Sequence, residues 1–369
     1  MSPLLFDSLE IRYFRAFDFL KIERLGHINL ILGKNNVGKS TLLEALYLHA
    51  NMGAPQVMRA ILDRRTEPYS DTYSMQSPMF DKLFFGNSHI SEIRQEIQIG
   101  RLGAPDSALR IAVTYVPANP QSISNDINGA PDYGAGFGDG SGGAVPALQV
   151  SGFGDTDYVL PLDRSFDELV RLWNLEKEHE EMITPGQFVP PNGLSSSQFQ
   201  DLWNIIALRP EKQDVIEALR IISPDITDIA LFAPRPDMKA FNLRLRGQDE
   251  PVPARSLGDG INRLIGLSMA LACAKDGILL VDEIENGIHW SIMPEVWKFI
   301  VKVAKRLNVQ VFATTHSNDC LKSFHFGTKD NPDIYGVAVR LEKRSDEYHA
   351  EIFDEQRLAV IVKEGIEIR

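Results

Sequence analysis

The feature that most constrains the fold is an eight-residue loop near the N-terminus, GKNNVGKS at residues 33–40. It satisfies the pattern G-x-x-x-x-G-K-[ST], in which backbone N–H groups surround a phosphate. Residues 28–32 before the loop form an apolar run typical of a buried strand, and residues 41–48 after it have the apolar spacing of a helix. Strand, glycine loop and helix in this order predict an α/β fold that binds nucleotide phosphates at the helix N-terminus.

We call residues 33–40 the phosphate loop and assign a role to each of its polar residues. Lys39 is expected to reach the β- and γ-phosphates, and the Ser40 hydroxyl to take one position on Mg²⁺. The expected nucleotide contacts within and beside the loop are Gly33, Asn35, Asn36, Gly38, Lys39, Ser40 and Thr41.

A second apolar run, residues 277–281, ends in the carboxylates Asp282 and Glu283. An uninterrupted apolar run is typical of a central parallel strand that is buried on both faces. Ligands of open α/β sheets lie beyond the carboxyl ends of such strands, so both carboxylates should emerge beside the phosphates. We expect Asp282 to hold Mg²⁺ and Glu283 to act as the catalytic base on the attacking water.

A further β-branched run, residues 309–315, ends in His316. Its position after the next expected strand makes His316 a catalytic candidate that donates to the γ-phosphate. Residues 254–264 combine Ser256, Gly258 and Gly260 with the start of an apolar helix, and the glycines permit a close backbone approach. This segment is expected to form a second phosphate-binding surface.

Bulk properties bound the class of protein. The chain has 369 residues, 44% of them apolar and 24% charged, as in ordinary globular proteins. The formal net charge of −12 argues against tight non-specific binding of nucleic acid, and two cysteines cannot form a disulfide framework. No apolar run is long enough to cross a bilayer, so we expect a cytoplasmic protein without a membrane partner.

Composition changes along the chain predict four segments. These are an N-terminal lobe with the phosphate loop (1–116), a glycine-rich insertion with a β segment (117–164), a helical insertion (165–222) and a C-terminal lobe (223–369). Strands are expected at 9–17, 28–32, 90–99, 109–116 and 241–246, and helices at 167–182, 197–208 and 212–222. The β and α pieces after residue 223 alternate, which is typical of a parallel sheet with crossover helices. The sequence contains no sustained heptad repeat, so we expect no long coiled coil.

The motifs in this order resemble the ATP-binding-cassette (ABC) ATPases of the SMC, RecF and OLD (overcoming lysogenization defect) group. Residues 14–17, FRAF, resemble the group's early Phe-Arg-x-Phe motif, and residues 35–40, NNVGKS, its phosphate loop. Residues 256–260, SLGDG, resemble its signature motif, and residues 282–289, DEIENGIH, its Asp-Glu-x-Glu-x-x-x-His block. His316 corresponds to the switch histidine.

This resemblance implies an ABC-type P-loop ATPase head with a mixed central sheet, a β-rich lobe and a helical insertion. It implies ATP and Mg²⁺ as ligands, Arg15 near the phosphates, and a homodimer or higher even-numbered assembly. Each ATP would lie between the phosphate loop of one copy and the Ser256 segment of the other. The group's glutamine loop corresponds to Gln76, Gln95 or Gln98.

Three functions remain open from the sequence. Because the sequence ends at residue 369, no C-terminal nuclease (topoisomerase-primase) domain is expected, and the chain resembles small stand-alone OLD-like ATPases. Many of these are encoded beside a nuclease or toxin in anti-phage or toxin-like modules, which implies an ATP-driven switch that controls a separate effector. The alternatives are a RecF-like DNA repair ATPase that contacts DNA directly, and a scaffold that binds ATP without turnover.

Overall fold

A six-stranded sheet in the order β15-β14-β3-β13-β12-β8 forms the centre of the molecule. The computed structural model describes residues 4–64, 80–86, 89–117, 144–152, 157–175, 184–235, 238–329 and 334–368. In chain order the central strands are β3 (Ile28–Leu32), β8 (Gly186–Val189), β12 (Ile278–Val281), β13 (Gln310–Thr314), β14 (Gly336–Arg344) and β15 (Glu347–Phe353). All neighbours pair in parallel except β14 and β15, which form an antiparallel hairpin.

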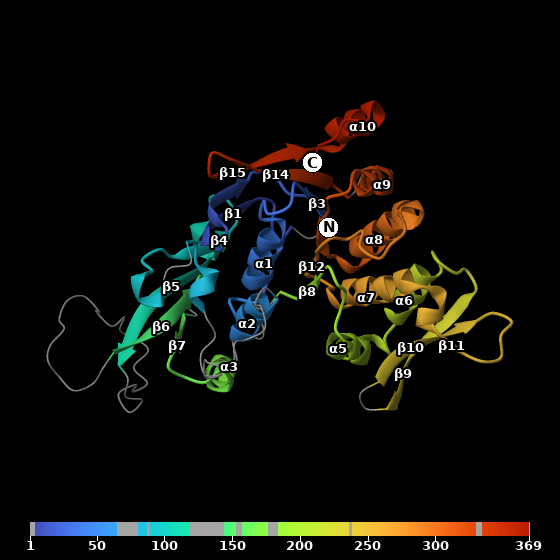
Figure 1. Cartoon of the computed structure of the whole chain (residues 1–369), viewed down its shortest axis with the longest axis horizontal. Coiled ribbons are helices and arrows are strands. Elements are labelled where there is room, and N and C mark those ends of the chain that lie inside the picture. Colours follow the sequence, from blue (N-terminus) through green and yellow to red (C-terminus); the bar gives the residue numbers. More distant parts are fainter. Residues whose placement is uncertain are drawn as a thin grey trace.

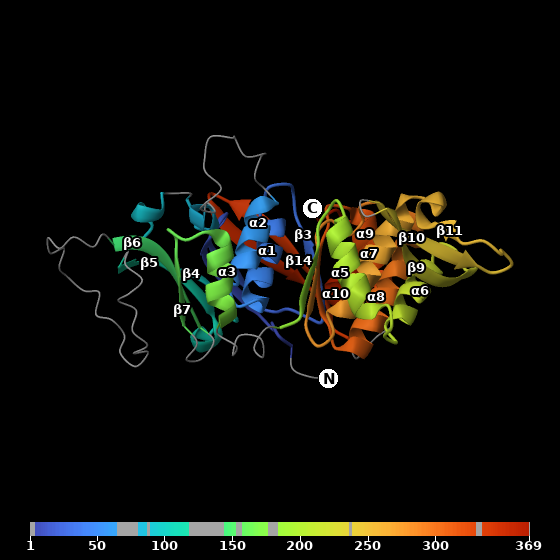
Figure 2. The ribbon, with the colours of Figure 1, turned by 90° about the horizontal axis from the view of Figure 1, so that it is seen from below.

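The central sheet is covered on both faces, which explains its continuous apolar strands. Helices α1 (Lys39–Ala50) and α2 (Pro55–Asp63) lie on one side of it, and α7 (Asp259–Cys273), α8 (Met293–Leu307) and α9 (Asn318–Thr328) lie on the other (Figures 1 and 2). Successive residues of β12 alternate between two buried clusters: Leu279 and Val281 face α7 and α8, while Ile278 and Leu280 face α1. The sheet therefore separates two hydrophobic cores.

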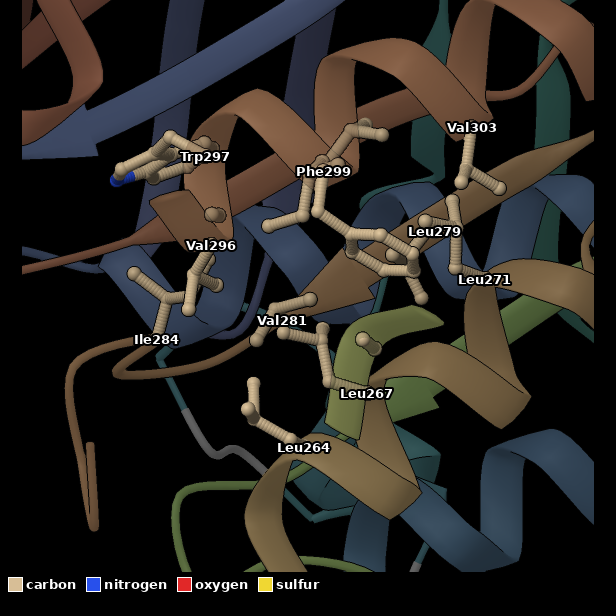
Figure 3. Close-up of a cluster of buried hydrophobic side chains, with 14 of the residues drawn as sticks. Leu264, Leu267, Leu271, Leu279, Val281, Ile284, Val296, Trp297, Phe299 and Val303 are labelled. Atoms are coloured by element: carbon tan, nitrogen blue, oxygen red, sulfur yellow. The ribbon is translucent and has the colours of Figure 1, made fainter. Parts of the chain in front are cut away.

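The core between α7, β12 and α8 holds the acidic end of β12 in place. Figure 3 shows leucines of α7 interleaved with Val281 and with Val296 and Phe299 of α8. Helix α8 has Pro294 in its first turn, Lys305 and Arg306 in its last turn, and ends at Asn308 in the left-handed conformation. Both ends of α8 thus satisfy the usual requirements of a helix, and its apolar face packs against β12.

A second six-stranded sheet, antiparallel throughout and ordered β2-β1-β4-β5-β6-β7, forms a lobe beyond α1 and α2 (Figure 1). Its strands are β1 (Leu9–Phe14), β2 (Phe17–Ile22), β4 (Ile97–Gly100), β5 (Leu109–Pro117), β6 (Ala144–Ser151) and β7 (Tyr158–Pro161). Helix α3 (Phe166–Leu175) follows β7 and lies beside α2.

The opposite end of the molecule carries a three-stranded antiparallel sheet and two helices (Figures 1 and 2). The strands are β9 (Ile226–Arg235), β10 (Met238–Leu245) and β11 (Val252–Pro253), and the helices are α5 (Ser196–Ile206) and α6 (Lys212–Leu219). Helix α10 (Glu355–Glu364) follows β15. No helix among the described residues is both long enough and apolar enough to cross a membrane.

The predicted α/β fold with a mixed central sheet, a β-rich lobe and helices between residues 165 and 222 is confirmed. The expected single strand at 9–17 is wrong, because the chain turns at Arg15 and forms the hairpin β1–β2. The strand expected at 90–99 is also wrong for its first half, where residues 90–92 form a 3₁₀ turn. The helical insertion contains strand β8, which the sequence analysis did not predict.

The four-segment division of the chain stays a prediction. The glycine-rich run at 132–143 lies outside the described residues, as do residues 176–182 of the helix expected at 167–182.

Candidate functional site

The parallel strands β3, β13 and β12 place three polar loops at one edge of the central sheet. The phosphate loop follows β3, residues 282–286 follow β12, and residues 315–317 follow β13. We call the last two the acidic turn and the switch loop. Backbone hydrogen bonds hold two of these loops to the ends of the neighbouring strands, since Thr315 N donates to Ile31 O of β3 at 3.0 Å and Ile284 N donates to Thr314 O of β13 at 3.1 Å. The sheet topology alone therefore assembles the predicted site.

Two glycines of the phosphate loop cannot be replaced without steric conflict. Gly33 has φ +143° and Gly38 has φ +90°, both in the region that favours glycine. A Cβ atom on Gly38 would lie 2.5 Å from the Phe17 ring, and one on Gly33 would lie 2.6 Å from the Leu341 carbonyl oxygen. The loop is held between the hairpin β1–β2 and strand β14.

The first turn of α1 suits an anion. Its N-cap is Gly38, which supplies no side-chain cap, and the first turn contains no acidic residue. N–H groups at such a helix start point outward with the positive end of the helix dipole behind them. Phosphate oxygens fit this position, because nothing in the first turn repels them or competes for the donors.

The Lys39 ammonium is folded back into the phosphate loop. It donates to Gly33 O at 2.7 Å and to Lys34 O at 2.9 Å, and the residue is 9% exposed. Burial lowers the pKa of Lys39, and three carboxylates of the acidic turn oppose that shift, namely Asp282, Glu283 and Glu285. Lys39 therefore lies within electrostatic reach of every acidic side chain of this turn.

Thr314, the last residue of β13, connects this strand to the acidic turn. Its hydroxyl donates to Asp282 Oδ1 at 2.5 Å and accepts from Glu283 N at 2.8 Å. Thr314 is fully buried and Asp282 is nearly so. A carboxylate held by a buried hydroxyl is fixed in orientation, as a metal-holding carboxylate must be.

The catalytic candidate Glu283 has a left-handed backbone with φ +47°. Residues other than glycine are uncommon in this region and are found there chiefly at functional sites. Asn286 Nδ2 donates to Glu283 Oε2 at 2.6 Å, so the amide orients the carboxylate. Glu283 is half-buried at the edge of the site, where a water molecule can reach it.

Arg263 ties helix α7 to the acidic turn. Its guanidinium donates to Pro190 O at 2.6 Å, Asp282 O at 3.0 Å and Glu283 O at 3.1 Å, and the residue is 7% exposed. Burial lowers the pKa of Arg263, and the acidic turn opposes that shift. Helix α7 and the acidic turn are thereby coupled through backbone carbonyls.

The segment with Ser256, Gly258 and Gly260 lies at the N-terminus of α7. Ser256 is exposed and its hydroxyl donates to Pro253 O at 2.7 Å. Gly258 has φ +96° and is the N-cap of α7 without a side-chain cap. Like that of α1, this helix start has no side-chain cap, but unlike α1 it has a carboxylate, Asp259, in its first turn. We call residues 254–260 the signature segment.

Arg15 lies against α1 rather than directly in the phosphate loop. Its Nε lies 3.4 Å from Glu44 Oε2, and both side chains are largely buried. Of the three glutamine candidates, Gln76 lies outside the described residues, and Gln98 Nε2 donates to Glu96 Oε2 at 2.7 Å on the β-rich lobe. Gln95 is exposed. None of these placements identifies a glutamine loop.

A hydroxyl from Ser40 and a carboxylate from Asp282 are hard oxygen donors of the kind that Mg²⁺ prefers when phosphate and water complete its shell. Within the described residues, no group of three or more histidine, cysteine or acidic side chains is arranged to bind a metal by itself. The donor set fits a metal that arrives with its nucleotide.

Sequence reasoning missed three of these residues as contributors to the site: Arg263, Thr314 and Asn286. The signal for Arg263 was present, because it is the only basic residue in the otherwise apolar helix α7. Thr314 carried no such signal, since a threonine is common in any β-branched strand.

Two segments match known domain families. Residues 162–320 match the family described as "AAA domain, putative AbiEii toxin, Type IV TA system", and residues 8–48 match a second AAA domain family. The first match covers the acidic turn and the signature segment, and the second covers the phosphate loop.

One relative spans most of the chain, and a second matches a short part of it. A Helicobacter pylori protein named ATP/GTP phosphatase is 23% identical over 378 residues, which cover 92% of this chain and 93% of that protein. A Methanocaldococcus jannaschii protein, MJECL10, is 52% identical over 42 residues, which cover 11% of this chain and 19% of that protein.

A solved structure has a similar fold. The crystal structure of an SMC head bound to the C-winged helix domain of ScpA aligns with a TM-score of 0.50 and 13% identity, and the match covers 95% of this chain and 98% of the other. Two stretches of the chain are therefore similar to AAA domains, and its fold resembles that of an SMC head.

Proposed function

We propose that the protein is a Mg²⁺-dependent ATPase in which two copies close around ATP, and that this cycle switches a separate effector protein. The relative from Helicobacter pylori is named an ATP/GTP phosphatase, which supports nucleotide hydrolysis by this chain. The site residues described above supply the parts that such a reaction needs.

The roles follow from the positions of the side chains. Backbone N–H groups of the phosphate loop and the first turn of α1 bind the phosphates, and Lys39 exchanges its bonds to the loop carbonyls for bonds to the phosphate oxygens. Ser40 and Asp282 would hold Mg²⁺, which when bound would supply positive charge to neutralise the phosphates. Glu283, oriented by Asn286, accepts the proton of the attacking water.

One observation carries the dimer: the signature segment is a second uncapped helix start, exposed to solvent. A helix N-terminus with two glycines and an exposed serine suits phosphate. The phosphate loop already has its own helix start in α1. The signature segment therefore serves a phosphate held by another copy, and two-fold symmetry makes both sites equivalent.

The test is the molecular mass in solution with and without ATP and Mg²⁺. We expect Glu283→Gln to form a stable dimer with ATP, because it binds the nucleotide but cannot deprotonate water. Lys39→Ala should stay monomeric and hydrolyse no ATP. If wild type and Lys39→Ala show the same mass and the same absence of turnover, the ATPase proposal fails. A wild type that is locked as a dimer with ATP and does not turn over would favour a scaffold instead.

The proposed effector control rests on the family description, which places related AAA domains in toxin–antitoxin systems. We infer that the ATP-bound dimer holds or releases a nuclease or toxin encoded nearby. When the neighbouring gene is co-expressed, its toxicity should differ between cells that make the wild-type protein and cells that make Glu283→Gln. Equal toxicity with both variants would exclude control by the ATP cycle.

A direct role in DNA repair predicts a different result. Phosphate-dominated binding weakens steeply with salt, so a DNA-binding ATPase should show ATP-dependent, salt-sensitive retention of DNA without any partner. The net charge of −12 disfavours this outcome. DNA binding at physiological salt by the purified protein would transfer the proposal to that function.

A further inference from the structure

Glu285, the fourth residue of the acidic turn, has no role in the site described so far. Its side chain reaches from the acidic turn to the switch loop and is 15% exposed. Its Oε1 accepts from Thr315 Oγ1 at 2.7 Å and from the backbone N of His316 at 3.1 Å. Glu285 therefore holds the start of the switch loop from two directions.

The same oxygen lies 3.3 Å from His316 Nδ1. Two donors of the switch loop thus converge on one carboxylate oxygen, and the Nδ1 edge of the His316 ring lies beside the same oxygen. The other oxygen, Oε2, is enclosed and has no hydrogen-bond partner among the described residues. The hydrogen bonds of this carboxylate are consequently all made with the switch loop.

The His316 ring is partly open to solvent. The His316 side chain is 50% exposed, in contrast to the largely buried Glu285. An imidazole whose Nδ1 donates to a carboxylate has Nε2 left for a ligand. A carboxylate that accepts from a functional histidine in this way fixes both its tautomer and its ring orientation.

The switch loop is itself braced behind the histidine. Thr315 Oγ1 accepts from Ser317 N at 3.0 Å, and the Ser317 hydroxyl caps α9 by accepting from Cys320 N at 3.3 Å. The backbone at His316 cannot turn without breaking this chain of bonds. Movement of the acidic turn is therefore transmitted to His316 through Glu285.

We propose that Glu285 is a positioning residue for His316: it keeps the Nδ1 edge of the ring engaged so that Nε2 faces the γ-phosphate. The inference rests on the proposed ATPase function, and it assigns to a residue of the acidic turn the task of coupling the switch loop to Asp282 and Glu283. Glu285 touches neither nucleotide nor water in this scheme. It acts only through the histidine.

The first test needs no activity. Histidine labelled with ¹⁵N in the nucleotide-free protein reports which ring nitrogen carries the proton, and the spectrum of His316→Ala identifies the His316 signals. We expect the Nδ1-protonated form in wild type and a mixture of forms in Glu285→Ala. A ring protonated at Nε2 in wild type, or one that Glu285→Ala leaves unchanged, would overturn the proposal.

The second test is a double-mutant cycle on ATP hydrolysis. We expect Glu285→Ala to lower kcat about 10- to 100-fold with KM for ATP changed by less than about threefold, as for other residues that orient a functional ligand. In a His316→Ala background the same change should cost less than about twofold. Glu285→Gln keeps the acceptor oxygen and should fall between wild type and Glu285→Ala.

Chemical rescue separates positioning from a merely structural role. Because His316 is half-exposed, free imidazole can enter the space left by His316→Ala. We expect imidazole to restore part of the activity when Glu285 is present and none when Glu285 is also alanine. Glu295→Ala, which removes an exposed carboxylate paired with Lys298, is the matched control and should behave as wild type.

Fully additive losses in the cycle, or equal rescue with and without Glu285, would refute positioning through His316. A wild type without any ATPase activity would refute the proposed function instead, and the labelled-histidine spectrum would still decide the placement of the ring.

Discussion

Replacement of Thr314 by valine tests whether the end of β13 holds the acidic turn in place. The two side chains have nearly the same shape, so Thr314→Val removes the hydroxyl without opening a cavity. The variant loses the donor to Asp282 Oδ1 and the acceptor for Glu283 N. Hydrogen bonds to a charged group contribute about 1.5–3 kcal/mol and neutral ones about 0.5–1.5 kcal/mol. The buried methyl group returns about 1 kcal/mol.

We therefore expect Thr314→Val to lower the free energy of unfolding by about 1–3.5 kcal/mol in the absence of nucleotide. The assay is urea denaturation followed by circular dichroism. Thr328→Val is the matched control, because that buried hydroxyl donates to backbone carbonyls of its own helix α9, Phe324 O at 3.0 Å and His325 O at 3.4 Å. The control should lose less than about 1 kcal/mol.

The same variant should weaken the use of Mg²⁺. Asp282 without its hydroxyl donor is no longer fixed in orientation. The loss of a hydrogen bond that orients a metal ligand typically costs about 10-fold or more in metal affinity or activity. The Mg²⁺ concentration for half-maximal ATPase activity should rise accordingly. If Thr314→Val matches Thr328→Val in both urea midpoint and Mg²⁺ dependence, the reasoning about this contact is refuted.

Three further predictions concern groups with shifted pKa values or unusual exposure. Burial lowers the pKa of Lys39 below the 10.5 of an unperturbed lysine, so just below pH 10.5 this group binds more protons in the unfolded chain than in the folded one. The free energy of unfolding of wild type should therefore rise relative to that of Lys39→Met between pH 8 and pH 10. A constant difference between their urea midpoints would contradict this. Burial lowers the pKa of His49 from 6.5 to about 4, so between these pH values the unfolded chain binds a proton at His49 that the folded chain does not. When the pH falls from 7 to 5, the free energy of unfolding of wild type should fall by on the order of 1 kcal/mol more than that of His49→Gln. Equal losses of the two proteins in urea denaturation would contradict this prediction. Trp290 follows the acidic turn and is 67% exposed. If dimerisation covers it, ATP should shift the tryptophan emission of Glu283→Gln to shorter wavelength. The same shift in a variant that also carries Trp290→Phe would show that this surface is not covered on dimerisation.

The phosphate loop, β12 and β13 could be predicted because their signals are local. Residues 28–32 and 278–281 are continuous apolar runs, and each leads directly into its polar loop. Parallel pairing then follows from the alternation of strands and helices, which explains why the common edge of the sheet was predictable. The nucleotide-contact and catalytic roles assigned to these loops stay predictions.

Strand β8 could not be predicted, since its pattern has no local signature. It is four residues long, Pro185 and Pro190 flank it, and it lies between helices. Only pairing with β12 makes it a strand, from Ile278 opposite Gly186 to Val281 opposite Val189. The 3₁₀ turn at 90–92 shows how weak a short pattern is: Ile90 favours a strand, Ser91 and Glu92 do not, and strand β4 begins only at Ile97.

The partners of Arg263 and Glu285 were likewise out of reach. Arg263 bonds to three backbone carbonyls, and two of these are 19 and 20 residues away while the third is 73 residues away. Carbonyl groups carry no sequence identity, so no motif can announce such a contact. Glu285 was visible within its motif, yet its link to residues 30 and 31 positions later depends on the register of β12 against β13.

The central claim is that each ATP is bound by Lys39 of one copy and Ser256 of the other. Complementation measures this directly: Lys39→Ala and Ser256→Arg are assayed separately and then mixed in equal amounts. Each variant alone should be inactive, whereas each mixed dimer has one of its two sites with both groups intact. Random pairing would make half of the dimers mixed and give about a quarter of the wild-type ATPase rate, and pairing in mixed dimers only, expected because Lys39→Ala does not pair with itself, would give about half. We predict a rate in the mixture between these two values. No activity above the sum of the separate variants would contradict the shared site.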